Sequence, residues 1–187
     1  MHSLVTVSKE STNPIHTKCL EIIGNLTRFP PNNGVLSRCN GVVDVLVLAA
    51  EYEAAVDRSS ALRALQNISA DASSKSLLAN NVVLGLLTAC SMSNEVDEKE
   101  AALAALLNIS TEPNAVVSIT NTNNLVATLI HLAHSPESSS NVRLIACEAL
   151  ATLSYWLQTL AGKGNVPEGI PNVPLPSQNA SGWERWT

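Results

Sequence analysis

Residues 61–69 read ALRALQNIS and residues 102–110 read ALAALLNIS, and this short pattern decides the fold. Looser copies are CLEIIGNLT at residues 19–27 and ACEALATLS at residues 146–154. The polar position shared by the four copies is filled by Asn25, Asn67, Asn108 and Thr152. It recurs after 42, 41 and 44 residues, within the roughly 40–47 residues typical of helical repeats that bury their apolar faces against one another. The chain is therefore predicted to be a stack of helices that functions as a surface.

Each copy has the apolar spacing of an α-helix. Ala61, Ala64, Leu65 and Ile68 fall at i, i+3, i+4 and i+7, and the other copies repeat this spacing. The intervening segments divide each unit into a short, a middle and a long helix. The expected short helices are 33–38, 74–79 and 115–120, the middle helices 42–51, 82–92 and 125–133, and the long helices 56–69, 97–110 and 141–160. A leading helix is expected from Pro14, after the capping residues Thr12 and Asn13, to about Arg28.

Asparagine and glycine mark the joint between the short and the middle helix of every unit. The joints read Asn40-Gly41, Asn80-Asn81 and Asn123-Asn124. These residue types tolerate a positive φ, which a sharp turn between helices commonly needs. A left-handed residue is therefore predicted at all three joints.

Composition limits the classes of protein that the chain can represent. Of its 187 residues 45% are hydrophobic but only 3% aromatic, so aliphatic side chains must fill the core. A net charge of -5 argues against nucleic-acid binding. No run of about 18 apolar residues is expected, since the best candidate, residues 42–50, is short and interrupted by Asp44, and residues 1–9 lack the pattern of a secretory signal. Four widely spaced cysteines, three of them expected on apolar helical faces, favour a reducing compartment, the cytoplasm or nucleus.

The repeated pattern resembles the armadillo repeat family over about residues 14–160. The resemblance implies an all-α, right-handed superhelical solenoid whose third helices line a concave groove. It also implies that Asn25, Asn67 and Asn108 point into that groove and hold the backbone of an extended peptide, with Thr152 offering only a shorter hydroxyl. The alternative is that each Asn braces the adjacent repeat instead.

At four positions the sequence differs from one branch of the family, and this difference argues against one function. Importin-α-like members place Trp four residues before the groove Asn, where this chain has Glu21, Arg63, Ala104 and Glu148. A nuclear-import receptor is therefore not expected, and the groove should carry charges of both signs. Trp156 either forms an aromatic wall of the groove or seals the last helix. The predicted partner-binding residues are Asn25, Asn67, Asn108, Thr152, Glu21, Arg63, Glu148 and Trp156.

No motif indicates catalysis, a cofactor or a metal. His131 and His134 have helical spacing for two metal ligands but lack a third. The three Asn-x-Ser/Thr sequences match a glycosylation acceptor, but they recur because the repeat recurs and are discounted. The acidic run at residues 97–100 opens a long helix, where solvation and the helix dipole are expected to explain it.

The chain is predicted to be a non-enzymatic protein-interaction module for an extended segment of a protein or peptide partner, without nucleic acid or membrane insertion. One alternative is a structural segment of a larger armadillo scaffold, and another is a repeat protein with an enzymatic or cofactor-handling role. The uncovered apolar face of the first helix suggests self-association or additional repeats. The expected divisions are a flexible segment 1–13, a solenoid 14–162 with repeats of about 29–69, 70–110 and 111–160, and a flexible Pro/Gly-rich tail 163–187. The two Trp residues of the tail are expected to pack on the chain itself or to have no role, and the alternative is a docking motif.

Overall fold

A computed structural model describes residues 14–52 and 55–162, and in these ranges the chain is helical without a strand. The elements are α2 (Pro14–Thr27), η1 (Pro30–Asn32), α3 (Asn33–Arg38), α4 (Val42–Tyr52), α5 (Ala55–Ser69), α6 (Ala72–Leu78), α7 (Asn81–Cys90), α8 (Val96–Ser110), η2 (Pro113–Ala115), α9 (Val116–Asn121), α10 (Leu125–His134) and α11 (Ser140–Gly162). The predicted segments 1–13 and 163–187, including Trp183 and Trp186, lie outside the described residues.

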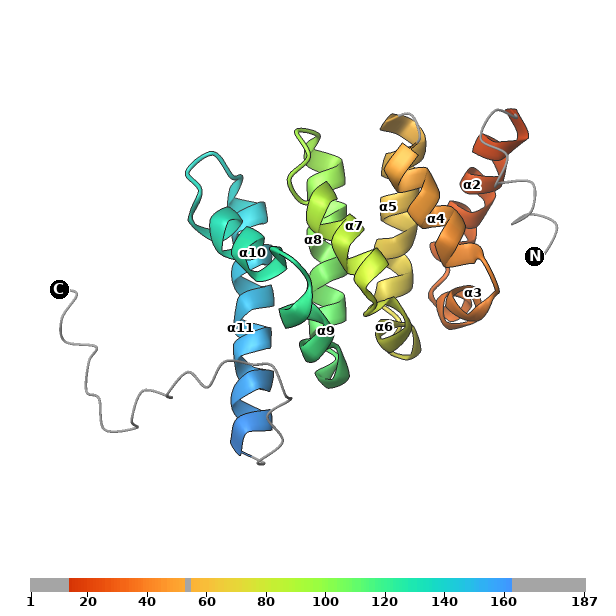
Figure 1. Ribbon diagram of the computed structural model, residues 1–187. Coiled ribbons are helices and arrows are strands. Elements are labelled where there is room, and N and C mark those ends of the chain that lie inside the picture. The colour runs from red at the N-terminus through yellow and green to blue at the C-terminus, as the bar shows by residue number, and fades with distance from the viewer. Residues whose placement is uncertain (1–13, 53–54, 163–187) are drawn as a thin grey trace, which may run out of the picture.

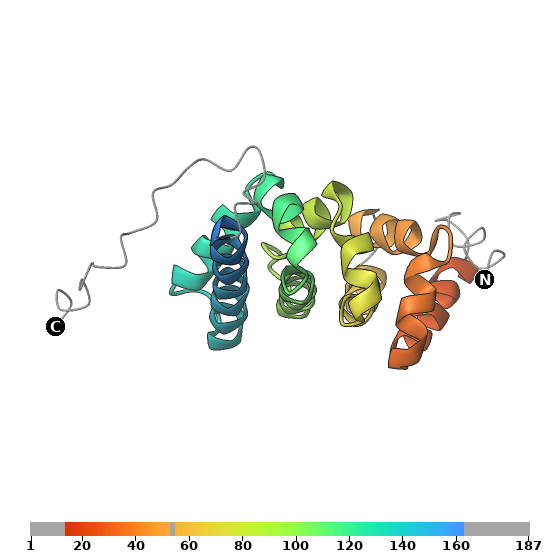
Figure 2. The same ribbon diagram turned by 90° about the horizontal axis from the view of Figure 1, so that it is seen from below.

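The helices form repeated layers (Figures 1 and 2). The long helices α2, α5, α8 and α11 stand side by side in chain order, and each packs against the next. The middle helices α4, α7 and α10 form a second row against them, and the short helices α3, α6 and α9 lie at one end. The predicted division into short, middle and long helices is confirmed.

One apolar core runs through all the units. The periodic residues of α5 are almost completely buried, at 0% exposure for Ala61 and Ile68 and 1% for Leu65. In the middle row, Leu46 and Leu84 are also fully buried. Burial of a leucine or isoleucine side chain contributes roughly 1.5–3 kcal/mol, so the long and middle helices hold the stack together through these contacts.

The joints agree with the prediction in two cases of three. Gly41 has φ 81° and Asn124 has φ 60°, as expected of a left-handed turn. At the middle joint the prediction is wrong, because Asn80 has φ -116°. Its side-chain oxygen accepts hydrogen bonds from the backbone N–H groups of Val82 and Val83, each at 3.1 Å. Asn80 therefore acts as an N-cap, which needs an extended backbone rather than a left-handed one.

Capping also moves the start of α6. This helix begins at Ala72, two residues before the predicted start, because the Asp71 carboxylate accepts from the backbone N–H of Ser73 at 3.1 Å. The short 3-10 helices η1 and η2, each opened by proline, were not predicted.

The last long helix differs from the others in length and in exposure. α11 has 23 residues, and by length and composition alone it could cross a membrane, with a mean hydropathy of 1.2. Two bent helix pairs, 30–38 with 42–51 and 96–110 with 113–121, pass the same test only if each pair counts as one span. The prediction that no apolar stretch reaches membrane-spanning length did not include this helix, which passes the test with two charged residues, Arg143 and Glu148, within it. One side of α11 is buried within the stack through Val142, Ala146, Ala149 and Leu153.

Candidate functional site

A groove of about 460 Å³ crosses the long helices from α2 to the start of α11. Its lining residues are Leu20, Glu21, Gly24, Asn25, Arg28, Ser60, Arg63, Ala64, Gln66, Asn67, Asp97, Glu100, Ala101, Ala104, Asn141 and Ile145. They come from all four long helices, because residues three or four apart share one helix face and the long helices lie parallel in a row. The result is one groove with both polar and apolar lining that is shared by four helices.

Half of the predicted partner-binding residues lie in this groove. Asn25, Asn67, Glu21 and Arg63 line it. The other four are not among its lining residues: Asn108, Thr152, Glu148 and Trp156. Trp156 is half-buried and packs against the core.

The repeated asparagines link neighbouring long helices. Asn67 Nδ2 donates to Thr27 Oγ1 at 3.2 Å, and Asn108 Nδ2 donates to Ser69 Oγ at 3.0 Å. Each hydroxyl in turn donates to a carbonyl three residues earlier in its own helix, at 2.7 Å for Thr27 and 2.6 Å for Ser69. We call this series of bonds the amide–hydroxyl ladder. In the Asn-x-Ser/Thr motif at residues 67–69 the asparagine thus donates to the preceding long helix, and the hydroxyl accepts from the following one.

The ladder occupies only part of each amide. A primary amide has two N–H donors and an acceptor oxygen, and at Asn67 the ladder uses one donor. The amide nitrogen of Asn108 also donates to the Gln66 carbonyl at 3.4 Å, beside its bond to Ser69. Asn67 and Asn108 are half-buried, whereas Asn25 in the first long helix is exposed. The ladder ends at α11, where Thr152 Oγ1 instead donates to the Glu148 carbonyl of its own helix at 2.8 Å. Bracing, the alternative interpretation of these residues, therefore occurs at Asn67 and Asn108.

Charges of both signs surround the asparagines. Arg63 joins Asp97 at 2.8 Å across the α5–α8 boundary, with 59% and 69% of the two side chains exposed. Lys18 lies 2.7 Å from Glu21, and their hydrogen bond, with the charge of each partner, raises the pKa of Lys18 and lowers that of Glu21. Such exposed pairs contribute little to stability, so their charges are available to a ligand.

Several lining residues were not predicted. Arg28 lies three residues after Asn25, and Glu100 lies eight residues before Asn108. Helical periodicity places both near the groove face, and a search at these offsets from the repeated asparagine would have found them. Gln66 precedes Asn67 directly, and no spacing rule singles it out.

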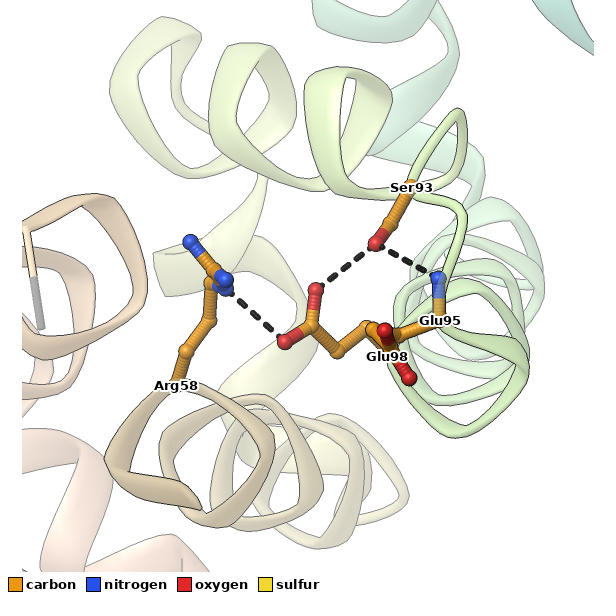
Figure 3. A network of polar contacts seen from close by, with 4 residues as sticks. All are labelled: Arg58, Ser93, Glu95 and Glu98. Carbon is orange, nitrogen blue, oxygen red and sulfur yellow. Dashed lines mark hydrogen bonds and ion pairs between the residues drawn. The ribbon is translucent and has the colours of Figure 1, made fainter. Parts of the chain in front are cut away.

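The acidic run that opens α8 is not simply solvated, which corrects the prediction. Glu98 is 2% exposed and accepts from Arg58 Nε and from Ser93 Oγ, each at 2.8 Å (Figure 3). Ser93 also accepts from the backbone N–H of Glu95 at 3.1 Å. The bond and charge of Glu98 raise the pKa of Arg58. Glu98 is buried because a helix from the preceding repeat supplies its partner, which a single-helix pattern cannot indicate.

A similar link occurs one repeat earlier, where Thr17 Oγ1 donates to Asp57 Oδ2 at 3.3 Å. Asp57 and Glu98 both lie ten residues before the ladder asparagine. In α11 the equivalent residue is the buried Val142, so this second series of polar links also ends there.

Other chemistry-bearing residues do not assemble. His131 and His134 are exposed, and His134 Nδ1 lies 3.0 Å from the Ile130 carbonyl. Within residues 14–52 and 55–162, no three His, Cys, Asp or Glu side chains are close enough to hold a metal ion. Cys19 and Cys90 are buried as predicted, but Cys147, expected on an apolar face, is exposed, and among the residues that the structure describes no further helix covers that side of α11.

Comparison with known proteins gives a likeness of fold alone. No protein-family profile and no curated protein matches the sequence. Among solved structures, the chain is similar to the crystal structure of an engineered protein from the Northeast Structural Genomics Consortium. The identity is 20% and the TM-score 0.66, and the match covers 88% of this chain and 69% of that one. At this identity the likeness supports a helical fold and carries no function.

Proposed function

We propose that this chain is a non-enzymatic, right-handed armadillo-type repeat protein that binds an extended segment of a partner protein in the groove of its long helices. The observation that carries the proposal is the groove of about 460 Å³ shared by the four long helices, in which Asn25 and Asn67 recur on successive helices. A groove shared by four helices suits a long, narrow ligand better than a compact one.

Backbone recognition follows from the chemistry of the amide. An extended peptide presents an N–H and a C=O at each residue, rising about 3.3 Å per residue. An asparagine can donate to one and accept from the other, which holds a chain without reading its sequence. The amide oxygen of Asn67 and its second N–H remain for this task, since the ladder uses one donor. Side-chain specificity would come from Arg28, Arg63 and Glu100 beside the asparagines.

A second candidate is a structural segment of a larger scaffold with no ligand of its own. The bonds from Asn67 and Asn108 to the preceding helices favour it, because they give the repeated asparagine a structural reason to be present. Asn25 separates the two candidates. It lines the groove, and within the described residues no long helix precedes it for bracing.

The test is a selection of random twelve-residue peptides displayed on phage against the purified chain, followed by affinity measurement of the selected peptides. We expect selected peptides to bind Asn25→Ala at least about fivefold more weakly, the effect of about 1 kcal/mol for one net hydrogen bond. Asn81→Ala is the matched control, since Asn81 is exposed in α7 and does not line the groove.

Thermal unfolding of the same variants separates binding from bracing. In a dilute, monomeric sample Asn25→Ala should keep the melting temperature of the wild type, whereas Asn67→Ala should lower it through loss of the bond to Thr27. Failure to select any peptide, or selected peptides that bind Asn25→Ala and the wild type equally well, would refute the groove function and leave the scaffold segment.

A further inference from the structure

Among the described residues, the two ends of the row of long helices expose the faces that inside the row contact a neighbouring long helix. Residues can be compared between long helices by counting from the position of the repeated polar residue, which we call the ladder position. It is residue 25 in α2, 67 in α5, 108 in α8 and 152 in α11. Three residues before it, the helices that follow another long helix carry an alanine that is at most 1% exposed: Ala64, Ala105 and Ala149. In α2 the equivalent residue is Ile22, and it is 43% exposed. The side of α2 that should face a preceding helix is therefore open.

The opposite side of α11 is open in the same way. In α2, α5 and α8, two positions of each helix face the following helix and are at most 1% exposed. Five residues before the ladder position they hold Leu20, Leu62 and Leu103, and two residues after it they hold Thr27, Ser69 and Ser110. In α11 the equivalents are Cys147 and Ser154, and both are exposed. The exposed Leu144 and Tyr155, at 56% and 60%, lie on the same helix.

We propose that copies of this chain associate head to tail, with α2 of one copy packing against α11 of the next. The joint would continue the contacts already present between α2 and α5 and between α5 and α8. It would also extend the amide–hydroxyl ladder. Asn25 is the exposed equivalent of Asn67, and Ser154 is the exposed equivalent of Thr27, so Asn25 would donate to Ser154 of the neighbouring copy as Asn67 donates to Thr27.

Side-chain size at the two ends fits this joint. Inside the stack, a leucine on one helix side accompanies an alanine on the facing side of the next helix. At the ends the order is reversed, with the small Cys147 on α11 and the large Ile22 on α2. Because the exchange keeps the apolar volume similar, the two faces can close without a cavity or a clash.

Charge at the groove edge of the joint is also complementary. Across the α5–α8 boundary Arg63 reaches Asp97. On α11 the residue equivalent to Arg63 is the acidic Glu148. On α2 the basic Lys18 lies four residues, about one helical turn, after the position equivalent to Asp97. The polarity of the pair is reversed, and Lys18, which pairs with Glu21 in its own helix, would meet a further opposite charge in Glu148.

A contact between two different faces does not close on itself, so it predicts an open series of assemblies. Sedimentation velocity of the full chain from about 1 µM to about 1 mM should show a mean mass that rises continuously above 19.8 kDa. Ile22→Glu blocks the α2 face, and Cys147→Lys blocks the α11 face. Each variant alone should remain a monomer. Because each retains one intact face, a 1:1 mixture should form a dimer and nothing larger.

Control variants show whether the exposed faces of α2 and α11 bind a second copy or something else. Val82→Glu, at a position on α7 that is 63% exposed, should assemble like the wild type. Ser154→Arg replaces Cys147→Lys if circular dichroism shows that the latter does not fold. A wild type that stays at monomer mass throughout overturns the proposal. So does assembly that survives both variants, or a monomer that binds lipid vesicles through α11. Peptide binding in the groove does not depend on Ile22 or Cys147, so the result leaves the proposed function untouched.

Discussion

Replacement of Arg58 by methionine tests the polar link between two repeats most directly. The Arg58 guanidinium lies 2.8 Å from the carboxylate of Glu98, which is 2% exposed (Figure 3). Removal of one partner of a fully buried ion pair costs about 3–5 kcal/mol, because the other charge stays buried without compensation. Here a third of the Arg58 side chain contacts solvent, and Ser93 still donates to the carboxylate. We therefore expect Arg58→Met to lower the free energy of unfolding by about 2–3 kcal/mol.

Replacement of the other partner, Glu98, should lower the free energy of unfolding by less. In Glu98→Gln the side chain keeps an acceptor oxygen for Arg58, and the guanidinium can turn toward solvent, so about 1 kcal/mol should be lost. In the double variant no buried charge is left unpaired. Its loss should therefore be smaller than the sum of the two single losses by about 1–2 kcal/mol.

Urea denaturation followed by far-ultraviolet circular dichroism measures all three variants. Arg143→Met, at an exposed arginine of α11, is the matched control and should change stability by less than about 0.5 kcal/mol. Two results would refute the reasoning. One is an Arg58→Met variant as stable as this control, and the other is strict additivity in the double variant, since either means that the pair is not fixed in solution.

Four further predictions concern single sites. Thr152→Asn should raise the unfolding free energy by about 0.5–1 kcal/mol, because its amide would reach the buried hydroxyl at the end of α8; urea denaturation showing a loss would contradict this. Gly34→Ala should lower it by about 1 kcal/mol, because a Cβ there would lie 2.8 Å from Asp71 Oδ1 in the neighbouring repeat, and Asp71→Ala should relieve part of that loss. The hydrogen bond from the Ser73 hydroxyl holds the pKa of Asp71 below its ordinary value of 3.8. The stabilisation that the Asp71 carboxylate contributes is therefore complete above pH 3.8 and is lost as the pH falls through the lower pKa of the folded state. Asp71→Asn should make the melting temperature fall less steeply with decreasing pH in the acid range. Burial raises the pKa of Cys90 to about 11, so iodoacetamide at about pH 8 should leave this thiol unmodified in the native chain, as mass spectrometry of the digested protein would show.

The helical fold could be predicted because its signal lies within single segments. The spacing of Ala61, Leu65 and Ile68 indicates one buried helix face, and the period near 41 residues indicates that the face meets a copy of itself. Helix starts were less predictable where a cap decides them. Asn80 could turn the chain by a positive φ or cap α7 with its side chain, and the sequence offers the same residue for both.

The candidate site could be predicted only in part because it is made between repeats. Asn25 and Asn67 were found because the motif repeats them, whereas Asp97 joins the groove through Arg63 of the preceding repeat. Glu98 was assigned to solvent because its own helix explains a charged first turn, and its partner lies 40 residues earlier. Pairings of this kind become visible from sequence only when both members are searched for at the repeat period.

The ladder has a consequence for how binding and stability are coupled in this chain. At Asn67 one amide both braces the preceding helix and faces the groove, so a change that weakens peptide binding there also weakens the stack. At Asn25 no long helix precedes α2 in the described chain, and the residue is exposed. The first long helix is therefore the place where the groove can change its ligand without a loss of stability. It is also the place where a second copy would restore the missing brace, so association of copies should make Asn25 resemble Asn67 in both properties.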